Sequence, residues 1–110
     1  MLTRESILKA NDIKTKKVNV KEWGGDVYIK TLSVGEAEDI SEIINSGKSD
    51  DISAMALWLV CSICDDKGNL LFTKADVPQL RKKAKEPVEA LFREIAILNN
   101  MGSLEETAKN

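Results

Sequence analysis

Two cysteines separated by two residues form the pattern in this chain that comes nearest to a chemical site. Cys61 and Cys64 have the spacing of redox pairs and of half zinc sites. They lie at the end of an apolar helix predicted over residues 52–64, where the helix dipole opposes thiolate formation. Zinc needs about four ligands, and the chain has no histidine and no third cysteine. We therefore expect both cysteines to pack in the core.

The acidic segment that follows, residues 65–69 with the sequence DDKGN, has the composition of a calcium loop. Its spacing does not fit. With Gly68 at the sixth loop position, Ile63 takes the first ligand position and Lys74 takes the last, where a bidentate glutamate is required. Only Asp65 falls on a ligand position. The preferences of Asp, Gly and Asn predict a structural turn instead.

The absence of histidine also removes the usual general base and every Ser-His or Cys-His nucleophile pair. No glycine-rich phosphate loop is present. We therefore expect no catalytic residue, no cofactor and no metal, which means that the protein is not an enzyme.

Two basic clusters remain, and they could bind phosphate groups. Their members are Lys14, Lys16, Lys17 and Lys21 in the first, and Arg81, Lys82, Lys83 and Lys85 in the second. No aromatic residues alternate with them, and the 18 acidic residues outnumber the 16 basic ones. We expect solvated surfaces and no nucleic-acid partner, and a small regulatory nucleic-acid binder is kept only as a third alternative.

The chain also has no sequence feature of a membrane or secreted protein. Its longest apolar run, residues 54–64, is much shorter than the roughly 20 residues that a membrane-spanning helix needs. The N-terminus lacks the pattern of a secretory signal. We expect the protein to work in a cytoplasm, with no membrane partner.

The sequence signals of helices and strands predict an α+β fold. A chain of 110 residues is near the common size of one domain. We predict a mainly helical single domain of four to five helices with one two-stranded antiparallel β-hairpin near the N-terminus. The expected parts are an N-terminal arm (1–15), the helical domain (16–101, hairpin 16–32) and a disordered C-terminal tail (102–110).

Alternating apolar residues predict the hairpin. They are Val18, Val20, Val27 and Ile29. A two-residue turn at Gly24-Gly25 would pair Val20 with Ile29 and Lys21 with Tyr28. An isolated two-stranded ribbon is barely stable in water, so we expect its apolar face to lie on the helices.

Capping signals predict the helices. Thr3 caps a short helix that reaches Asn11, with Ile7 and Ala10 facing inward. Ser33 and Glu36 form a capping box for a helix that ends at Gly47, with inward residues Ala37, Ile40, Ile43 and Ile44.

Two further helices are predicted near the C-terminus. Asp76 caps a helix with Pro78 in its first turn. The last helix is expected to run from Pro87 to about Asn99, because Pro87 forces Glu86 out of helical geometry. The apolar face of this helix consists of Val88, Leu91, Phe92, Ile95 and Leu98. Gly102 is expected to end this helix. Earlier in the chain, the segment Leu70-Leu71-Phe72 is expected to cross the core in extended conformation before Thr73.

The order of these blocks resembles the phage tail assembly chaperones, small proteins of long-tailed bacteriophages. The resemblance rests on Trp23-Gly24 in the hairpin, the apolar helix over 52–64, the turn from Asp65 to Gly68, and Leu71-Phe72-Thr73. It spans roughly 80 to 90 residues by position.

This resemblance implies a chaperone that binds the tape-measure protein during tail morphogenesis, contacts the tail tube protein and is absent from the mature virion. It implies a phage or prophage gene, a location in the host cytoplasm, and an extended product made by programmed frameshifting near the end of the reading frame. The alternative is a small structural tail or head-tail joining protein that stays in the virion.

A protein that holds a long helical client needs apolar surface beyond what its own core hides. The helix over 52–64 has apolar residues on both flanks, and Leu57 and Trp58 lie on the second flank. We predict that Ile44, Leu57 and Trp58 contact the partner, in a single chain or in a homo-oligomer. For Trp58 a core role and an interface role both remain open, whereas Trp23 is expected to pack at the hairpin end.

Overall fold

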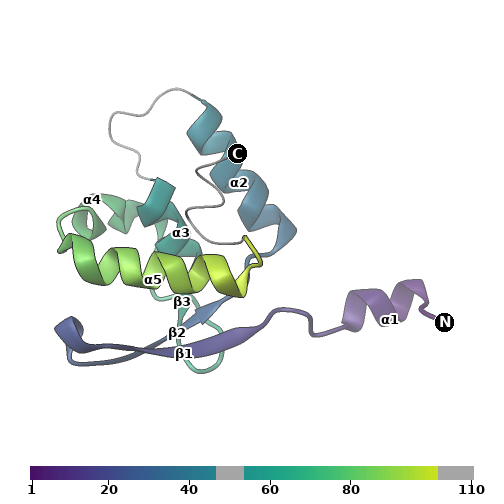
Figure 1. The fold of residues 1–110 in the computed structure, drawn as a ribbon. Helices are drawn as coiled ribbons and strands as arrows, with labels where there is room; N and C mark the ends of the chain where they lie inside the picture. The colour runs from purple at the N-terminus through teal and green to yellow at the C-terminus, as the bar shows by residue number, and fades with distance from the viewer. Residues whose placement is uncertain (47–53, 102–110) are drawn as a thin grey trace.

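The computed structural model of the chain describes residues 1–46 and 54–101. Its elements in chain order are α1 (Arg4–Lys9), β1 (Thr15–Val20), the 3₁₀ turn η1 (Lys21–Trp23), β2 (Gly25–Lys30), α2 (Val34–Asn45), α3 (Ala54–Ser62), β3 (Ile63–Cys64), the 3₁₀ turn η2 (Lys74–Asp76), α4 (Val77–Leu80) and α5 (Lys85–Leu98) (Figure 1). The predicted class is confirmed: the described part forms an α+β domain with five helices, an N-terminal hairpin and a short third strand.

The hairpin is confirmed, but its predicted register and turn are wrong. Val20 pairs with Gly25 and not with Ile29. Four residues connect the strands, because residues 21–23 form a 3₁₀ turn and Gly24 follows in the left-handed region at φ 75°. The pairing differs from the predicted one by an even number of residues, so the apolar side chains stay on the predicted face.

The apolar helix ends two residues earlier than predicted, because a third strand follows it. α3 ends at Ser62, whereas Ile63 and Cys64 pair antiparallel with Ile29 and Tyr28 of β2. Ile63 is β-branched and fully buried. Pairing with β2 supplies hydrogen-bond partners for its backbone groups, which water cannot reach. The predicted helix start near residue 52 lies outside the described residues.

The predicted turn after β3 is confirmed. The backbone N–H of Asp65 donates to the carbonyl of Asn69 at 2.9 Å, and Gly68 takes φ 86°. The Asp65 carboxylate accepts hydrogen bonds from the backbone N–H groups of Asn69 and Lys67, which lower the pKa of that carboxyl. The extended segment after the turn does not cross the core as predicted, because Leu70 and Leu71 are exposed and only Phe72 packs inward.

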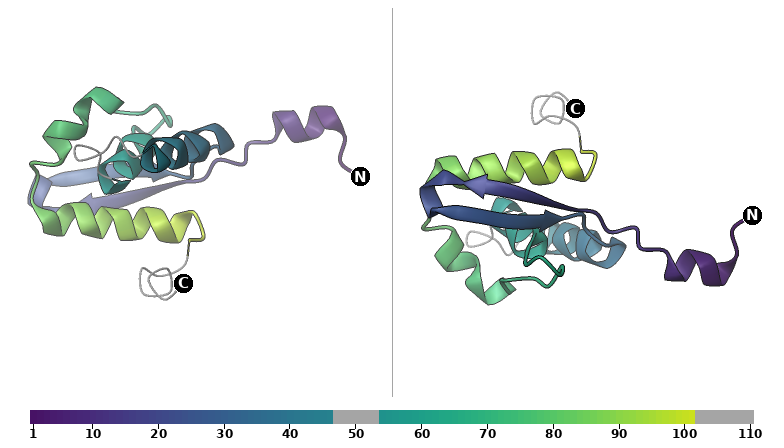
Figure 2. Two further views of the ribbon diagram at one scale, coloured as in Figure 1. Left: turned by 90° about the horizontal axis from the view of Figure 1, so that it is seen from above. Right: turned by 90° about the horizontal axis from the view of Figure 1, so that it is seen from below.

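The core consists of two apolar clusters that share α3. In the first, α3 meets α2 and α4; its buried members are Ile40, Ala56, Leu57, Val60, Cys61, Val77 and Leu80. In the second, α3 and α5 meet the inner face of the sheet; its buried members are Val20, Ile29, Leu59, Ile63, Leu91 and Ile95. The views from above and below show the hairpin lying over the seam between α5 and the other helices (Figure 2). Both flanks of α3 are apolar because each flank enters a different cluster.

The capping box of α2 is confirmed, since Ser33 and Glu36 cap each other's backbone N–H groups. The inward face is narrower than predicted. Ile40 is buried and Ile43 is partly buried, but Ala37 and Ile44 are exposed. α2 is only a partial cover of α3, which explains why its outer positions remain in solvent. The predicted stop at Gly47 lies outside the described residues.

The N-terminal helix α1 forms where predicted, and Thr3 and Ser6 make a capping box at its start. Its predicted inward face is wrong: Ile7 is 55% exposed and no residue of α1 is buried. All views place α1 away from the body of the domain (Figures 1 and 2). The apolar side chains of α1 therefore have no packing partner within the described chain.

The last two helices follow their signals with shifted boundaries. α4 begins after Asp76 with Pro78 in its first turn, as predicted, but the predicted cap is wrong. The Asp76 side chain makes no hydrogen bond to α4, because it accepts the backbone N–H of Thr73 at 2.8 Å. α5 begins at Lys85, so the prediction that Glu86 leaves helical geometry is wrong. Pro87 is only the third helical residue, and the first turn of a helix needs no intrahelical N–H partner. α5 ends at Leu98, with Asn100 at φ 58°, before Gly102, which is not described.

A partly buried ion pair joins the sheet to α2. The Lys30 ammonium donates to Glu36 Oε1 at 2.7 Å, and Lys30 is only 8% exposed. The same carboxylate oxygen accepts the backbone N–H of Ser33 at 2.9 Å. Burial alone would raise the pKa of Glu36, but the hydrogen bonds from Lys30 and Ser33 and the charge of Lys30 outweigh it and lower the pKa.

We expect Glu36→Gln to lower the free energy of unfolding at neutral pH by about 2 kcal/mol, because it leaves the Lys30 ammonium without its charged acceptor. The folded pKa of Glu36 lies below its ordinary value of 4.5, so this stabilisation is complete above that value and disappears as pH falls through the folded pKa. Urea unfolding between neutral and acid pH measures the effect. The two proteins should converge in acid, and a gap that stays constant with pH would contradict this assignment. Glu38→Gln, at an exposed position of the same helix, is the control.

Candidate functional site

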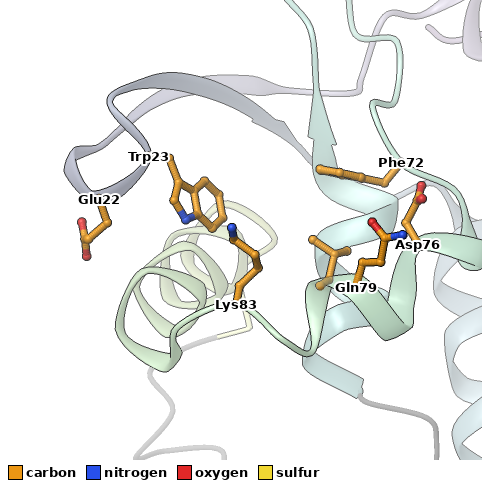
Figure 3. A pocket seen from close by; sticks show the side chains of 7 residues that line it. Glu22, Trp23, Phe72, Asp76, Gln79 and Lys83 are labelled. Atoms are coloured by element: carbon orange, nitrogen blue, oxygen red, sulfur yellow. The ribbon is translucent and has the colours of Figure 1, made fainter.

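A cleft of about 460 Å³ lies between the tip of the hairpin and α4 (Figure 3). Its lining residues are Glu22, Trp23, Phe72, Asp76, Gln79, Leu80 and Lys83. They come from two segments: the hairpin turn, and the stretch from Phe72 through η2 and α4 to Lys83. In Figure 3, Trp23 and Phe72 lie at opposite sides of the cleft, and the Lys83 side chain points toward Trp23.

Local turn chemistry positions the two aromatic residues of the cleft. Trp23 is the last residue of η1, and Gly24 in the left-handed region then reverses the chain. Phe72 precedes the capping box in which Thr73 and Asp76 bind each other's backbone N–H groups. Both rings are partly buried and pack against the second core cluster, so they are held in place while part of each remains accessible. The predicted packing role of Trp23 at the hairpin end is confirmed.

The cleft combines an apolar floor with a polar rim of mixed charge. Leu80 is buried and lines the same cleft, whereas Glu22 and Lys83 are exposed. The lining contains no cysteine and no hydroxyl group. Partly buried aromatic side chains inside a polar rim are typical of protein-binding surfaces. The arrangement is therefore suited to binding a side chain of another protein.

The cysteines do not form a site. Cys61 and Cys64 are both buried free thiols, which confirms the predicted core packing. Burial raises the pKa of both thiols, and the charge of Glu36 raises that of Cys61 further. Among the residues that the structure describes, no three His, Cys, Asp or Glu side chains come close enough to hold a metal ion.

The three residues predicted to contact a partner do not form one surface. Ile44 is 42% exposed on α2, whereas Leu57 is 3% exposed in the first core cluster. Trp58 is partly buried, and its ring packs edge-on against Phe92 with the centroids 6.3 Å apart. Partner contact at these positions stays a prediction, and the burial of Leu57 leaves that residue with a structural role in the described fold.

The sequence does not indicate the cleft as a site. It marks Trp23 and Phe72 separately, but their approach depends on the four-residue hairpin turn and on the path of residues 65–73. The signal that could have found the cleft is the pair of aromatic residues, each beside a turn. The first basic cluster also has a contact that the sequence does not indicate, because Lys16 pairs with Glu94 of α5 at 2.7 Å.

Comparison with known proteins identifies the family. Residues 2–106 match the family model described as "Phage tail assembly chaperone, TAC". The chain belongs to the phage tail assembly chaperone family. It therefore functions as a tail assembly chaperone of a bacteriophage, and the family is not enzymatic, as predicted.

A solved structure has the same fold. It is titled "Structure of bacteriophage HK97 tail assembly chaperone", and it matches with a TM-score of 0.64 and 20% sequence identity over 86% of this chain and 94% of its own chain. No curated protein sequence matches this chain. In the described part of the chain, none of the helices has both the length and the apolar character needed to cross a membrane.

Proposed function

We propose that this chaperone binds the tape-measure protein in the host cytoplasm and leaves before the virion is complete. The observation that supports this proposal is the cleft between the hairpin tip and α4, where Trp23 and Phe72 remain partly accessible above an apolar floor. A tape-measure protein is expected to be long, helical and partly apolar. Side chains on one face of such a helix would fill a cleft of this kind.

Within this proposal the cleft supplies the main anchor, and the three predicted contact residues lie outside it. Ile44 on α2 is exposed and would add contact area at a distance from the cleft. Trp58 packs against both core clusters and would act on the client mainly by supporting the cluster that also holds Trp23 and Phe72. Leu57 would reach a client only if the first core cluster opened.

The tail tube protein is the second partner in this proposal. An extended product made by frameshifting would carry the additional domain that contacts the tube. Sequencing the gene through the codons for Lys109 and Asn110 tests this part, because an adenine-rich slippery run that allows re-pairing after a one-nucleotide slip is required there.

Co-expression with the tape-measure protein tests the main proposal. Affinity capture of the tape-measure protein, followed by size-exclusion chromatography with light scattering, should yield a complex that contains this chain. Separate elution of the two proteins in mild salt would contradict the proposal. Mass spectrometry of purified virions tests departure from the particle: a stoichiometric signal would favour the alternative of a retained tail or head-tail joining protein.

The exposed helix α1 is our candidate for self-association into a homo-oligomer. Leu2, Ile7 and Leu8 are exposed, and an isolated helix of this length is marginal in water unless another surface packs against it. We expect deletion of residues 2–11 to change the free energy of unfolding of the domain by less than about 0.5 kcal/mol, since α1 buries nothing there. Light scattering should show a smaller assembly after the deletion. An unchanged mass distribution would exclude α1 as the self-association element.

A further inference from the structure

The outer edge of β1 is an open backbone surface. The sheet order β1-β2-β3 places β1 at an edge. The carbonyl of Lys14 accepts the N–H of Thr31 at 2.9 Å, and bonded positions alternate along an antiparallel ladder. Thr15, Lys17 and Asn19 therefore direct their backbone N–H and C=O groups away from β2. No strand in residues 1–46 or 54–101 pairs with this edge.

A groove of about 360 Å³ lies beside the same edge, between β1 and α5. Val18, Val20, Leu91 and Ile97 contribute to its apolar lining, and its charged lining residues are Glu22, Arg93 and Glu94. A strand added to the edge of β1 would direct alternate side chains toward α5, because successive side chains of a strand point to opposite faces. The edge thus offers main-chain hydrogen bonds together with a place for apolar side chains, which are the two parts of strand addition.

The charge along β1 indicates what kind of strand would fit. Residues 13–21 contain four lysines and no acidic residue. Lys16 pairs with Glu94, but Lys14, Lys17 and Lys21 make no ion pair with any other described residue. An acidic strand would supply the missing charges. A second copy of β1 would instead bring lysines together, which disfavours pairing of this edge with itself.

We propose that the outer edge of β1 binds an acidic extended segment of another protein, which adds a fourth strand to the sheet and packs its apolar side chains in the groove beside α5. The site is separate from the cleft at the hairpin tip, and it stands whether or not the tape-measure protein is the client of that cleft. Lysine side chains on an edge strand also discourage aggregation, so the test must separate specific pairing from this general effect.

Amide exchange of the full chain, measured by NMR in the presence of short synthetic peptides, separates specific strand pairing from the general effect of the lysines. The probe is an acidic peptide that alternates Glu and Val, compared with the same peptide carrying Lys in place of Glu. A third peptide carries the acidic sequence with alternate backbone nitrogens methylated. The acidic peptide should slow amide exchange at Thr15, Lys17 and Asn19 by at least about tenfold, as expected for newly formed hydrogen bonds. The other two peptides should leave exchange unchanged.

Two variants of Lys17 complete the test. Lys17→Glu should weaken binding of the acidic peptide by about tenfold and reduce its salt dependence. Lys17→Pro removes an outward N–H, which an edge strand tolerates, and should abolish the protection. If Lys17→Pro does not fold, Lys17→Glu alone decides the charge requirement and the methylated peptide decides the backbone requirement. Equal binding of the methylated peptide, or no binding of the acidic one, would overturn the proposal.

Discussion

Ile95→Ala should lower the free energy of unfolding by about 3 kcal/mol, because it removes a large side chain from a fully buried position. Ile95 has no exposed surface and belongs to the cluster formed by α3, α5 and the sheet. For a domain near this size, each kcal/mol shifts the unfolding midpoint by roughly 4–8 °C. Thermal unfolding followed by circular dichroism should therefore show a decrease of about 12–24 °C.

Ile97→Ala provides the matched control for this experiment. Ile97 is the same residue type on the same helix, but it is 60% exposed. Its replacement should change the free energy of unfolding by less than about 0.5 kcal/mol. Similar losses for the two variants would mean that α5 does not present the described face to the sheet.

Trp23→Ala should weaken binding of the tape-measure protein by about 30-fold or more, corresponding to the loss of about 2 kcal/mol that marks a central aromatic anchor. Trp23 contributes one of the two aromatic walls of the cleft and remains partly accessible there. Titration of purified chaperone with the tape-measure protein, followed by calorimetry, measures the dissociation constant. Since Trp23 also packs against the core, the thermal midpoint of the variant is measured alongside.

A second variant keeps the test independent of stability. Gln79→Trp places a bulky group at an exposed position of the cleft rim and should reduce binding without removing any core side chain. Leu71→Ala is the control, since Leu71 is an exposed apolar residue next to Phe72 that does not line the cleft. If Leu71→Ala weakens binding as much as the cleft variants do, the client contacts a broader surface than the one proposed.

Local signals predict the elements of the fold well, because each depends on a few neighbouring residues. The capping box of Ser33 and Glu36, the turn after Asp65 and the apolar spacing of α5 all lie within single segments. The chain order of these blocks is also enough to indicate the family. The amino-acid sequence alone therefore predicts both the fold class and the tail assembly chaperone family.

Features that depend on long-range packing cannot be predicted in the same way. The apolar character of both flanks of α3 suggests surplus surface, but two clusters on opposite sides of the helix bury Leu57 and Leu59. The short strand Ile63–Cys64 forms only because β2 lies beside it, and no local periodicity distinguishes two strand residues from the end of a helix. The cleft arises where residues 22–23 meet residues 72–83, two segments far apart in the sequence, so no single motif predicts it.

Hydrogen exchange on the complex of this chain with the tape-measure protein tests the central claim most directly. We predict that the backbone amides of the hairpin turn at residues 22–24 and of residues 72–83 become protected in the complex relative to the free chain. A stable complex in which these amides exchange at the rate of the free chain, with protection confined to other segments, would contradict the proposal that the cleft holds the client.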